Sequence, residues 1–428
     1  MALRQGSDLM EAAQTLTGGA RAVARCDALG VAPFSDMEGG LYRAYLTPAY
    51  HAAQEALAGW MAEAGMSVRR DAAANLVGRY EGEQADAPAL IIGSHLDSVR
   101  DGGCYDGPLG IMLGVECVAA LHGAGRRLPF AIEVYAFGDE EGSRFPAAML
   151  TSRAVAGTLE PEALAIADAA GVTLAEAGVD LIDYLSARRS PASVLAYLEA
   201  HIEQGPVLEA RGLALGTVTG IAAQLRYRVS VKGLAGHAGT SAMALRRDPL
   251  PAAAEIVLAA ENAALAEGGD AVATVGRIEA LPGAANVIAG EVRLTLDVRA
   301  GEAGRRDRVA EAILEQIAAI AEARGLDFDV ELVHDLPPSP CAESLMGLMD
   351  AALAAAGQSP FRLVSGAGHD AMNMAALCPT AMLFIRCRGG ISHNPAEHVE
   401  PEDAEAALGV MLGFIEGLAR REGDLHAR

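Results

Sequence analysis

One strand, helix and strand unit, built almost wholly of apolar residues, constrains the fold of this chain most strongly. Ala89–Gly93 (ALIIG) predicts a short buried strand, and Phe130–Phe137 (FAIEVYAF) predicts a second one. Between them, Leu109–Leu121 (LGIMLGVECVAAL) is apolar nearly all round, as expected of a helix that other elements cover. Strands that are apolar on both faces belong to parallel sheets with helices on each side, and such sheets bind ligands beyond the carboxyl ends of their strands. We therefore expect an α/β domain whose mixed, mostly parallel sheet is flanked by helices.

A second module begins near residue 221, where the pattern of the sequence changes. Two segments, RYRVSVK and EVRLTLDVR, alternate polar with apolar residues, which is typical of antiparallel strands with one solvated face. The predicted order of this module is strand, helix, strand, strand, helix and strand, over Arg226–Lys232, Pro249–Ala264, Ala271–Ile278, Glu291–Arg299, Arg305–Arg324 and Phe328–Val333. This order indicates a ferredoxin-like α+β sandwich.

The second module is predicted to be an insertion in the first. Leu336–Pro340 (LPPSP) is interpreted as a linker. A helix, a glycine-rich turn at Ser365–Asp370 (SGAGHD) and the apolar strand Thr380–Ile385 follow it, so the first domain resumes. We predict a discontinuous α/β domain of residues 1–220 and 336–428 and an inserted domain of residues 221–335.

The charge of the chain excludes two classes of partner. With 33 basic and 56 acidic residues the formal net charge is -23, which repels nucleic acid backbones and anionic lipids. The longest charge-free apolar stretch near the C-terminus, Ala371–Ile385, contains Asn373 and Pro379 and is shorter than the roughly 20 residues of a membrane span. We expect neither a nucleic acid nor a membrane partner.

Cysteine usage and the N-terminal segment point to a compartment. The six cysteines are scattered without a CxxC pair. The segment MALRQGSDLMEAAQ carries two acidic residues where a secretion signal needs an apolar run. We therefore expect a reduced, cytoplasmic protein.

Polar clusters lie where the predicted strands of the first domain end. The clusters are GSHLDSV after the first buried strand, YDGPLG before the covered helix, GDEEGSRF after the second strand, HIEQGP, and ISHNPAEH after the last strand. Their candidate ligands are His95, Asp106, Glu140, Glu141, His201 and His393. Imidazoles and carboxylates suit Zn²⁺, Mn²⁺ or Co²⁺, so these clusters predict a metal centre.

A two-metal site explains why so many such residues are present. In this arrangement one carboxylate bridges the ions, and each ion takes two further protein ligands. Asp106 is the natural bridge. Neighbouring residues on an extended segment point opposite ways, so one of Glu140 and Glu141 can bind metal while the other accepts a proton from an activated water molecule. Asp97, two residues after His95, is expected to hydrogen-bond the imidazole of His95 and orient it.

Each of these signals is weak when it is taken alone. A lone histidine is more often an ordinary core or surface residue, and we interpret His51, His122, His334, His398 and His426 in that way. The DEE sequence by itself fits a solvated acidic turn equally well. Its position directly after an apolar strand, among the other clusters, favours the metal centre.

Taken together, the motifs GSHLDSV, DGPLG, DEEGSRF, HIEQGP, AGHAGT and ISHNPAEH resemble those of the dinuclear-metal amidohydrolases related to aminoacylase and carboxypeptidase G. The match is to the branch of allantoate amidohydrolase, N-carbamoyl-L-amino-acid hydrolase and β-ureidopropionase, and it extends from about Ala49 to Ala407. The resemblance implies one ion on His95, Asp106 and His201, a second on Asp106, Glu141 and His393, and Glu140 as the general base. Zinc is expected, with manganese or cobalt as alternatives. The resemblance also implies that the inserted domain is a lid that forms a homodimer.

The same resemblance implies which residues bind the substrate, a small ureido or amide compound that bears a carboxylate. Arg299 matches the family's carboxylate-binding arginine, and Asn286 matches its amide-bearing partner. Arg226 and Gln204 are expected to make further substrate contacts. His237 resembles the histidine that polarises the scissile carbonyl or stabilises the oxyanion, and it is expected to reach the site from the other subunit. An exposed strand arginine with an ion-pair partner is the alternative for Arg226 and Arg299.

Two segments depart from the family pattern. AGHAGT is followed by SAM in place of a threonine-proline pair, and LPGAANVIAG lacks the family's earlier asparagine and later proline. Neither change removes a metal ligand or the base, so both bear on which ureido acid is taken. The turn Gly366–Asp370 is interpreted as a cap on the following helix rather than as pocket lining.

The function expected from these features is that of an allantoate amidohydrolase, which converts allantoate and water to ureidoglycine, ammonia and CO₂. N-carbamoyl-L-amino-acid hydrolase is the nearest alternative. A peptidase or aminoacylase of the wider family would instead cleave dipeptides or N-acetyl amino acids. A non-catalytic assembly protein, with a structural metal or none, is an alternative of another class, and the intact ligand set argues against it.

Overall fold

The computed structural model describes residues 9–426, with side chains as far as residue 423, so the side chain of His426 lies outside the described residues. The chain forms two compact units. Unit 1 runs to Thr219 and takes in Cys341–Leu363 and the chain from His369 onward, while unit 2 consists of Gly220–Pro340 and Val364–Gly368. Two details differ from the sequence prediction. The expected linker ends in a short strand of unit 2, and residues 364–368 belong to unit 2 rather than to the larger domain.

Unit 1 is built around a mixed sheet. Its elements are α2 (Gly18–Leu29), α3 (Pro48–Glu63), β1 (Ser67–Arg70), β2 (Leu76–Tyr80), β3 (Ala89–His95), α4 (Pro108–Gly123), β4 (Ala131–Phe137), α5 (Leu150–Ala156), β5 (Val194–Ile202), α6 (Val207–Ala210), β6 (Leu215–Ile221), α9 (Glu343–Ala355), β14 (Arg362–Ser365), α10 (Ala371–Met374), β15 (Thr380–Ile385) and α11 (Pro401–His426). The strands of the sheet lie in the order β1-β2-β4-β3-β5-β15-β6-β13, where β13 is Ser339–Pro340, and β14 also pairs with β6.

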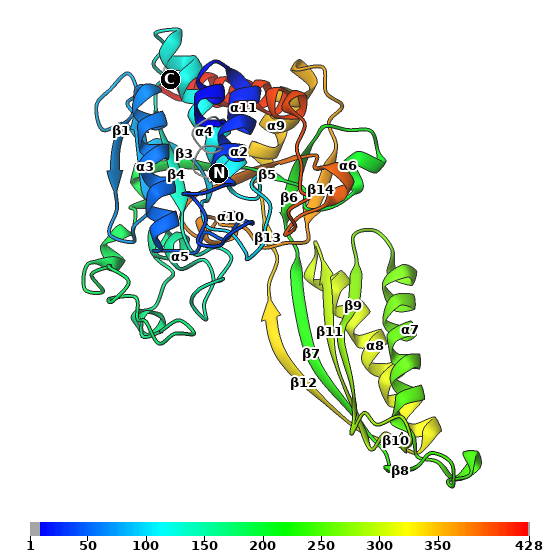
Figure 1. Ribbon diagram of the computed structural model, residues 1–428. Coiled ribbons are helices and arrows are strands. Elements are labelled where there is room, and N and C mark those ends of the chain that lie inside the picture. The colour runs from blue at the N-terminus through cyan, green and yellow to red at the C-terminus, as the bar shows by residue number, and fades with distance from the viewer. Residues whose placement is uncertain (1–8, 427–428) are drawn as a thin grey trace. The chain divides into compact units, whose positions relative to one another are not determined.

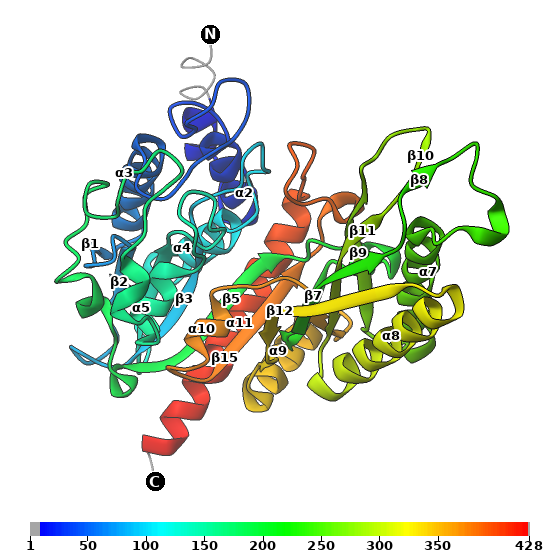
Figure 2. The ribbon, with the colours of Figure 1, turned by 90° about the horizontal axis from the view of Figure 1, so that it is seen from below.

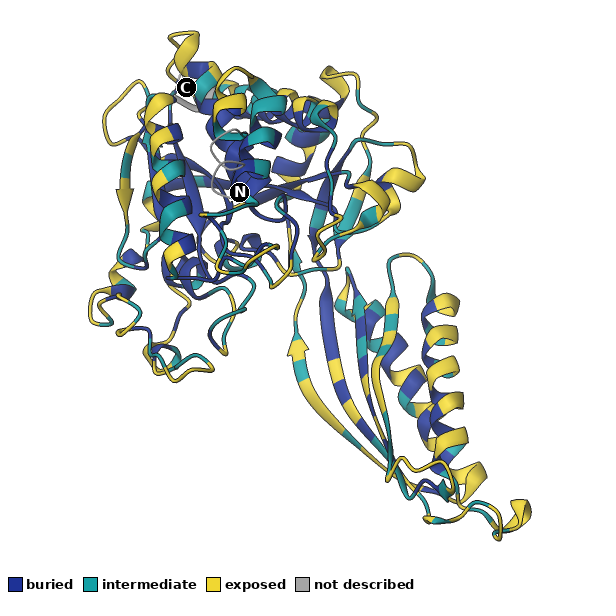
Figure 3. Ribbon diagram, in the orientation of Figure 1, coloured by how far each residue is buried: buried dark blue, intermediate teal, exposed yellow. Residues whose placement is uncertain are grey.

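The centre of this sheet is parallel. β3 pairs in parallel with β4 and β5, and β15 pairs in parallel with β5, whereas β2 and β6 are antiparallel to their neighbours. Every residue of β3 and β4 is buried, and Figure 3 shows these strands dark throughout. The prediction of an α/β fold with a mixed, mostly parallel sheet is confirmed.

Helices cover the sheet and explain its apolar strands. Figure 1 shows α2, α4, α9 and α11 gathered together, and α4, α9 and α11 pack against strands of the sheet. α4 is buried at most of its positions, as its uniformly apolar sequence predicts. α5 and α10 pack on each other, and α10 also contacts β5 and β15. None of the helices in the described part of the chain is long and apolar enough to span a membrane.

Local sequence signals set where helices begin. The hydroxyl of Thr47 accepts a hydrogen bond from the backbone N–H of Tyr50, and Pro48 occupies the first turn of α3. Pro108 likewise occupies the first turn of α4, directly after Gly107, which has a positive φ of 84°. The turn before α4 therefore brings Asp106 to the edge of the sheet.

Unit 2 has the predicted strand and helix order. Its elements are β7 (Ala223–Lys232), β8 (Gly236–His237), α7 (Pro249–Glu267), β9 (Val272–Leu281), β10 (Val287–Ile288), β11 (Glu291–Ala300), α8 (Ala303–Arg324), β12 (Asp327–Leu336) and β13 (Ser339–Pro340). The four long strands are antiparallel in the order β12-β7-β11-β9, which is the ferredoxin-like arrangement. Figure 2 shows α7 and α8 side by side along this sheet, and alternate residues of β7 and β11 are buried against them.

Candidate metal centre

The carboxyl ends of the four parallel strands of unit 1 bring the predicted ligands together. β3 ends at His95, and His201 is the second-last residue of β5. Glu140 and Glu141 follow the end of β4, and His393 follows β15. Because parallel strands end at the same edge of a sheet, these side chains converge although they are distant in the sequence.

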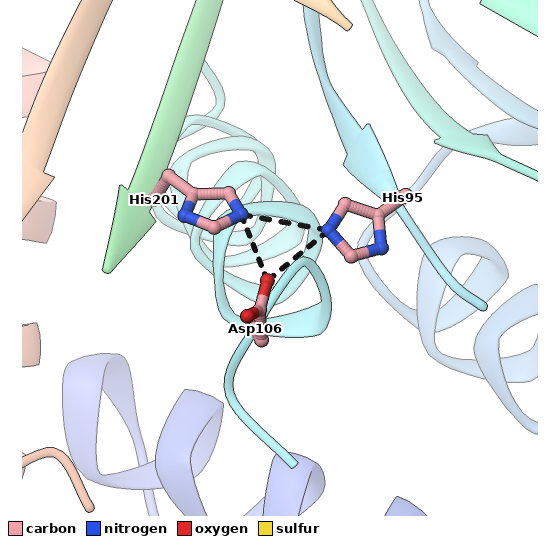
Figure 4. A group of neighbouring side chains, drawn as sticks. All are labelled: His95, Asp106 and His201. Carbon is pink, nitrogen blue, oxygen red and sulfur yellow. Dashed lines mark hydrogen bonds and ion pairs between the residues drawn. The ribbon is translucent and has the colours of Figure 1, made fainter. Parts of the chain in front are cut away.

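Three buried side chains form the first group of possible metal ligands. The Nε2 atoms of His95 and His201 lie 3.3 and 3.2 Å from Oδ1 of Asp106, and the two Nε2 atoms are 3.5 Å apart. Figure 4 shows both imidazoles pointing at the Asp106 carboxylate, one from the end of each strand. Ligand atoms at the corners of a tetrahedral zinc site are about 3.3 to 3.6 Å apart, given bonds of about 2.0 to 2.2 Å. The observed spacing therefore fits a divalent ion.

Backbone carbonyls fix the orientation of both imidazoles. Nδ1 of His95 lies 3.0 Å from the carbonyl oxygen of Asp97, and Nδ1 of His201 lies 2.9 Å from that of Ile202. A carbonyl can only accept, so each Nδ1 donates to its carbonyl and each ring turns its Nε2 toward Asp106. Each imidazole is thereby oriented so that Nε2 is the atom available to a metal ion.

Asp106 also belongs to the second group. Nε2 of His393 lies 3.5 Å from Oδ2 of Asp106 and 3.4 Å from Oε1 of Glu141. The ligand atoms of these three residues all lie within 4.8 Å of one another. Asp106 thus presents one oxygen to each group, as a bridging carboxylate must. The side chain of His393 is 48% exposed, so the second group is open to solvent on one side.

Asp97 does not do what the sequence predicts. Its carboxylate is 3.9 Å from Nδ1 of His95, and it is the backbone carbonyl of Asp97 that accepts from that nitrogen. The two carboxylate oxygens instead accept the backbone N–H groups of Glu140 and Glu141, each at 3.2 Å. The expected side-chain contact is therefore wrong, because the carboxylate faces the acidic pair and fixes the backbone that carries it.

The acidic pair is buried, and its environment favours a cation. Burial, together with the charge of Glu141, raises the pKa of Glu140 well above its usual range, and burial raises the pKa of Glu141 to about 8. For Asp106, burial would also raise the pKa, but hydrogen bonds from His201 and His95 outweigh it and hold the pKa well below normal. Carboxylates in such a site gain free energy from a nearby positive charge, so the donor set fits divalent metal ions.

Gln204 lies beside the bridging carboxylate. Its Nε2 donates to Oδ2 of Asp106 at 2.8 Å, and the Ser392 hydroxyl donates to the same oxygen at 2.6 Å. The backbone of Gln204 is left-handed, with φ 56°. The sequence reasoning missed Ser392, although its place directly before His393 was a usable signal.

The glycine-rich turn packs behind the first group of ligands. The buried ring of His369 lies 4.5 Å from that of His201, centroid to centroid, and contacts Phe384 on its other side. Asp370 precedes α10 but its side chain makes no capping hydrogen bond, and Glu199 of β5 accepts the N–H of Ala371 instead. The predicted capping role is thus filled by another strand, and His369 restrains the ring of His201.

The remaining predicted residues lie in unit 2 and form two pairs. His237 is exposed on β8, which pairs with β10, and the carbonyl of Asn286 accepts the N–H of Ala238. Arg226 and Arg299 both bind Asp297, at 2.7 Å from each Nε. The structure therefore brings the predicted metal ligands and Gln204 together in unit 1, and places the other predicted site residues on unit 2.

Comparison with known proteins identifies the family. Residues 91–417 match the model of peptidase family M20/M25/M40. An N-carbamoyl-L-amino acid amidohydrolase of Geobacillus stearothermophilus is 44% identical over 90% of this chain and 95% of its own length. Allantoate deiminase 2 of Glycine max is 40% identical over 93% and 89%. A crystal structure of an amidase of the hydantoinase/carbamoylase family from Burkholderia multivorans is 33% identical, with a TM-score of 0.84 over 96% of this chain and 97% of that one.

This chain belongs to peptidase family M20/M25/M40. It is a hydrolase that acts on carbon–nitrogen bonds. The family and the enzyme class predicted from the six motifs are confirmed.

Proposed function

We propose that the protein hydrolyses the carbon–nitrogen bond of a ureido or N-carbamoyl group on a small carboxylate. The observation that carries this proposal is the convergence of His95, Asp106, His201, Glu141 and His393 at the ends of four parallel strands, with Glu140 beside them. We propose one ion on His95, Asp106 and His201 and a second on Asp106, Glu141 and His393, with zinc as the first choice and manganese or cobalt as alternatives.

Divalent ions bound in these groups would polarise the carbonyl and lower the pKa of a water molecule. Glu140 accepts a proton from that water, and the resulting hydroxide attacks the ureido carbon. As the carbon–nitrogen bond breaks, Glu140 returns the proton to the leaving nitrogen. Asp97 holds the Glu140 backbone through the hydrogen bond described above, so the carboxylate stays in place through both proton transfers.

Arg299 is suited to bind the substrate carboxylate. Its Nε and Nη2 donate to the two oxygens of Asp297, at 2.7 and 3.1 Å, and its Nη1 donates to the carbonyl of Gly366 at 2.5 Å. A guanidinium has five N–H groups, so one remains on each terminal nitrogen. Two N–H donors of one guanidinium can bind the two oxygens of a carboxylate. The ion pair with Asp297 is the alternative raised for Arg299, and it uses only part of the hydrogen-bonding capacity of the guanidinium.

Allantoate is the first candidate substrate, and N-carbamoyl-L-amino acids are the second. The motif set favours allantoate, while the relative at 44% identity carries the name of an N-carbamoyl-L-amino acid amidohydrolase. The test is ammonia release by purified protein loaded separately with Zn²⁺, Mn²⁺ and Co²⁺. The panel contains allantoate, N-carbamoyl-L-methionine, a dipeptide and an N-acetyl amino acid. Turnover of the last two alone would refute the proposal.

We further propose a homodimer in which unit 2 of one subunit supplies His237 to the site of the other. Co-expression of Glu140→Gln and His237→Ala chains tests this. In a mixed dimer one site has both an intact Glu140 and an intact His237. Random pairing makes half of the dimers mixed, so activity should return to about a quarter of wild type, although each variant alone is nearly inactive. Mixed dimers that remain inactive would exclude the shared site.

A further inference from the structure

The loop that carries Asp106 has room for no side chain at two of its positions. A Cβ on Gly103 would overlap the carboxylate of Glu397, and a Cβ on Gly107 would overlap the ring of His95. Gly107 also has a positive φ of 84°. The backbone on both sides of Asp106 is therefore packed closely against the side chains of Glu397 and His95. A shift of either side chain would change the position of Asp106.

Glu397 accepts hydrogen bonds from this backbone. Its Oε1 accepts the N–H of Tyr105 at 2.9 Å and the N–H of Asp106 at 3.0 Å. Glu397 is 5% exposed, and its second oxygen is buried without a hydrogen-bond partner among the described residues. Hydrogen bonds from successive N–H groups to one carboxyl oxygen fix both the distance and the direction of the segment that donates them.

The short segment from Ser392 to Glu397 therefore contacts Asp106 at both ends. Ser392 donates to the side-chain oxygen Oδ2 at 2.6 Å, and Glu397 accepts from the backbone. The same segment carries His393, a ligand of the second group. A shift of this segment would move Asp106 and His393 together.

We propose that Glu397 is a positioning residue of the metal centre, which sets the backbone of Asp106 so that one carboxylate reaches both groups of ligands. The inference rests on the proposed metal site and extends it to a residue that lies outside both ligand groups. What Glu397 supplies is a correctly placed acceptor oxygen. Hence we expect the length of the side chain, which places this oxygen, to affect metal binding more than its charge does.

Two conservative variants separate reach from charge. Glu397→Gln keeps an acceptor oxygen at the same reach and removes the charge. Glu397→Asp keeps the charge but is shorter by one methylene, so it cannot reach both N–H groups without moving the loop. Mutation of such supporting residues typically weakens metal binding about 10- to 100-fold. We expect that loss in Glu397→Asp and a change of only a few fold in Glu397→Gln.

The chain offers a matched control in Glu203. This buried glutamate also accepts two successive backbone N–H groups, from Val207 at 2.7 Å and Leu208 at 2.9 Å, but these belong to α6 rather than to the Asp106 loop. Glu203→Asp should lose a comparable amount of thermal stability and keep its metal affinity.

The measurement is the affinity of full-length protein for zinc chloride, by competition with a chelator, together with the number of ions per chain by elemental analysis. Wild-type affinity in Glu397→Asp would overturn the proposal. So would a loss in Glu397→Gln that equals or exceeds the loss in Glu397→Asp, or an equal loss in Glu203→Asp. No substrate is present in this experiment. A wild-type protein that binds two ions but hydrolyses no ureido compound would refute the proposed function and leave this inference standing.

Discussion

Glu140→Gln is the most informative single change in the active centre. Glu140 is 8% exposed, and its backbone N–H donates to Asp97, so the substitution alters neither the anchor of the loop nor the volume that the side chain fills. Glutamine cannot accept the proton. General acid–base catalysis contributes about 10²- to 10⁴-fold in rate, or about 2.7 to 5.5 kcal/mol of activation free energy. The expected result is a fall in kcat of at least about 10²-fold, with KM changed little.

Metal content distinguishes the two adjacent glutamates. Glu141 lies with Asp106 and His393 in the second group, whereas Glu140 lies in neither of the two proposed groups and is grouped with His95 and Glu141. Glu140→Gln should therefore keep its full complement of ions, and Glu141→Gln should lose an ion. Both variants are assayed for ammonia release after loading with the metal that best supports the wild type, and elemental analysis is run on the same samples.

Two outcomes would refute this division of roles. If metal-replete Glu140→Gln keeps more than about a tenth of the wild-type rate, Glu140 is not the base. If Glu140→Gln loses an ion while Glu141→Gln does not, the ligand and the base are exchanged.

Three further results are expected. Glu116→Ala should lower the free energy of unfolding in urea by about 3 kcal/mol, because the buried Arg25 would lose Glu116 and keep only a longer ion pair with the exposed Glu63, and the partly exposed Arg21 would lose its carboxylate partner. Glu116→Gln, which keeps an acceptor, should cost less. Arg299→Lys should raise KM for carboxylate substrates about tenfold or more, because an ammonium cannot form two parallel hydrogen bonds, and an equal effect on an uncharged amide analogue would contradict this. Chelation should abolish turnover and lower Tm. Each ion restored at about a hundred times its Kd should return about 2.7 kcal/mol of stability, measured by calorimetry.

Periodicity and apolar runs were enough to predict three of the four parallel strands at the centre of the sheet, β3, β4 and β15. β3, β4 and β15 are covered on both faces, so their sequences are apolar and easily recognised. β5 was not predicted because it contains Glu199 and His201 although it is buried. Glu199 is satisfied there by Ser94 and Tyr197, and no local pattern reveals contacts from such distant segments.

The candidate ligands were predictable by residue type and motif, but their supporting contacts were not. Asp97 was correctly identified as a residue near His95. Whether its carboxylate or its backbone carbonyl accepts the hydrogen bond from His95 depends on the direction that the chain takes after β3, which the sequence does not reveal. The return of residues 364–368 to unit 2 likewise depends on a long-range contact, in which Ser365 accepts the N–H of Ala222. Contacts of this kind arise from the assembled sheet.

The order of strands in unit 1 also determines how early in translation the proposed metal centre can form. β15 comes after the whole of unit 2 in the chain, yet it lies next to β5 in the sheet. A nascent chain on the ribosome therefore carries His95, Asp106 and His201 long before it carries His393. Until His393 is translated, the chain carries the first group of candidate ligands but not the complete second group, so the proposed pair of ions can be bound only late in synthesis or after it.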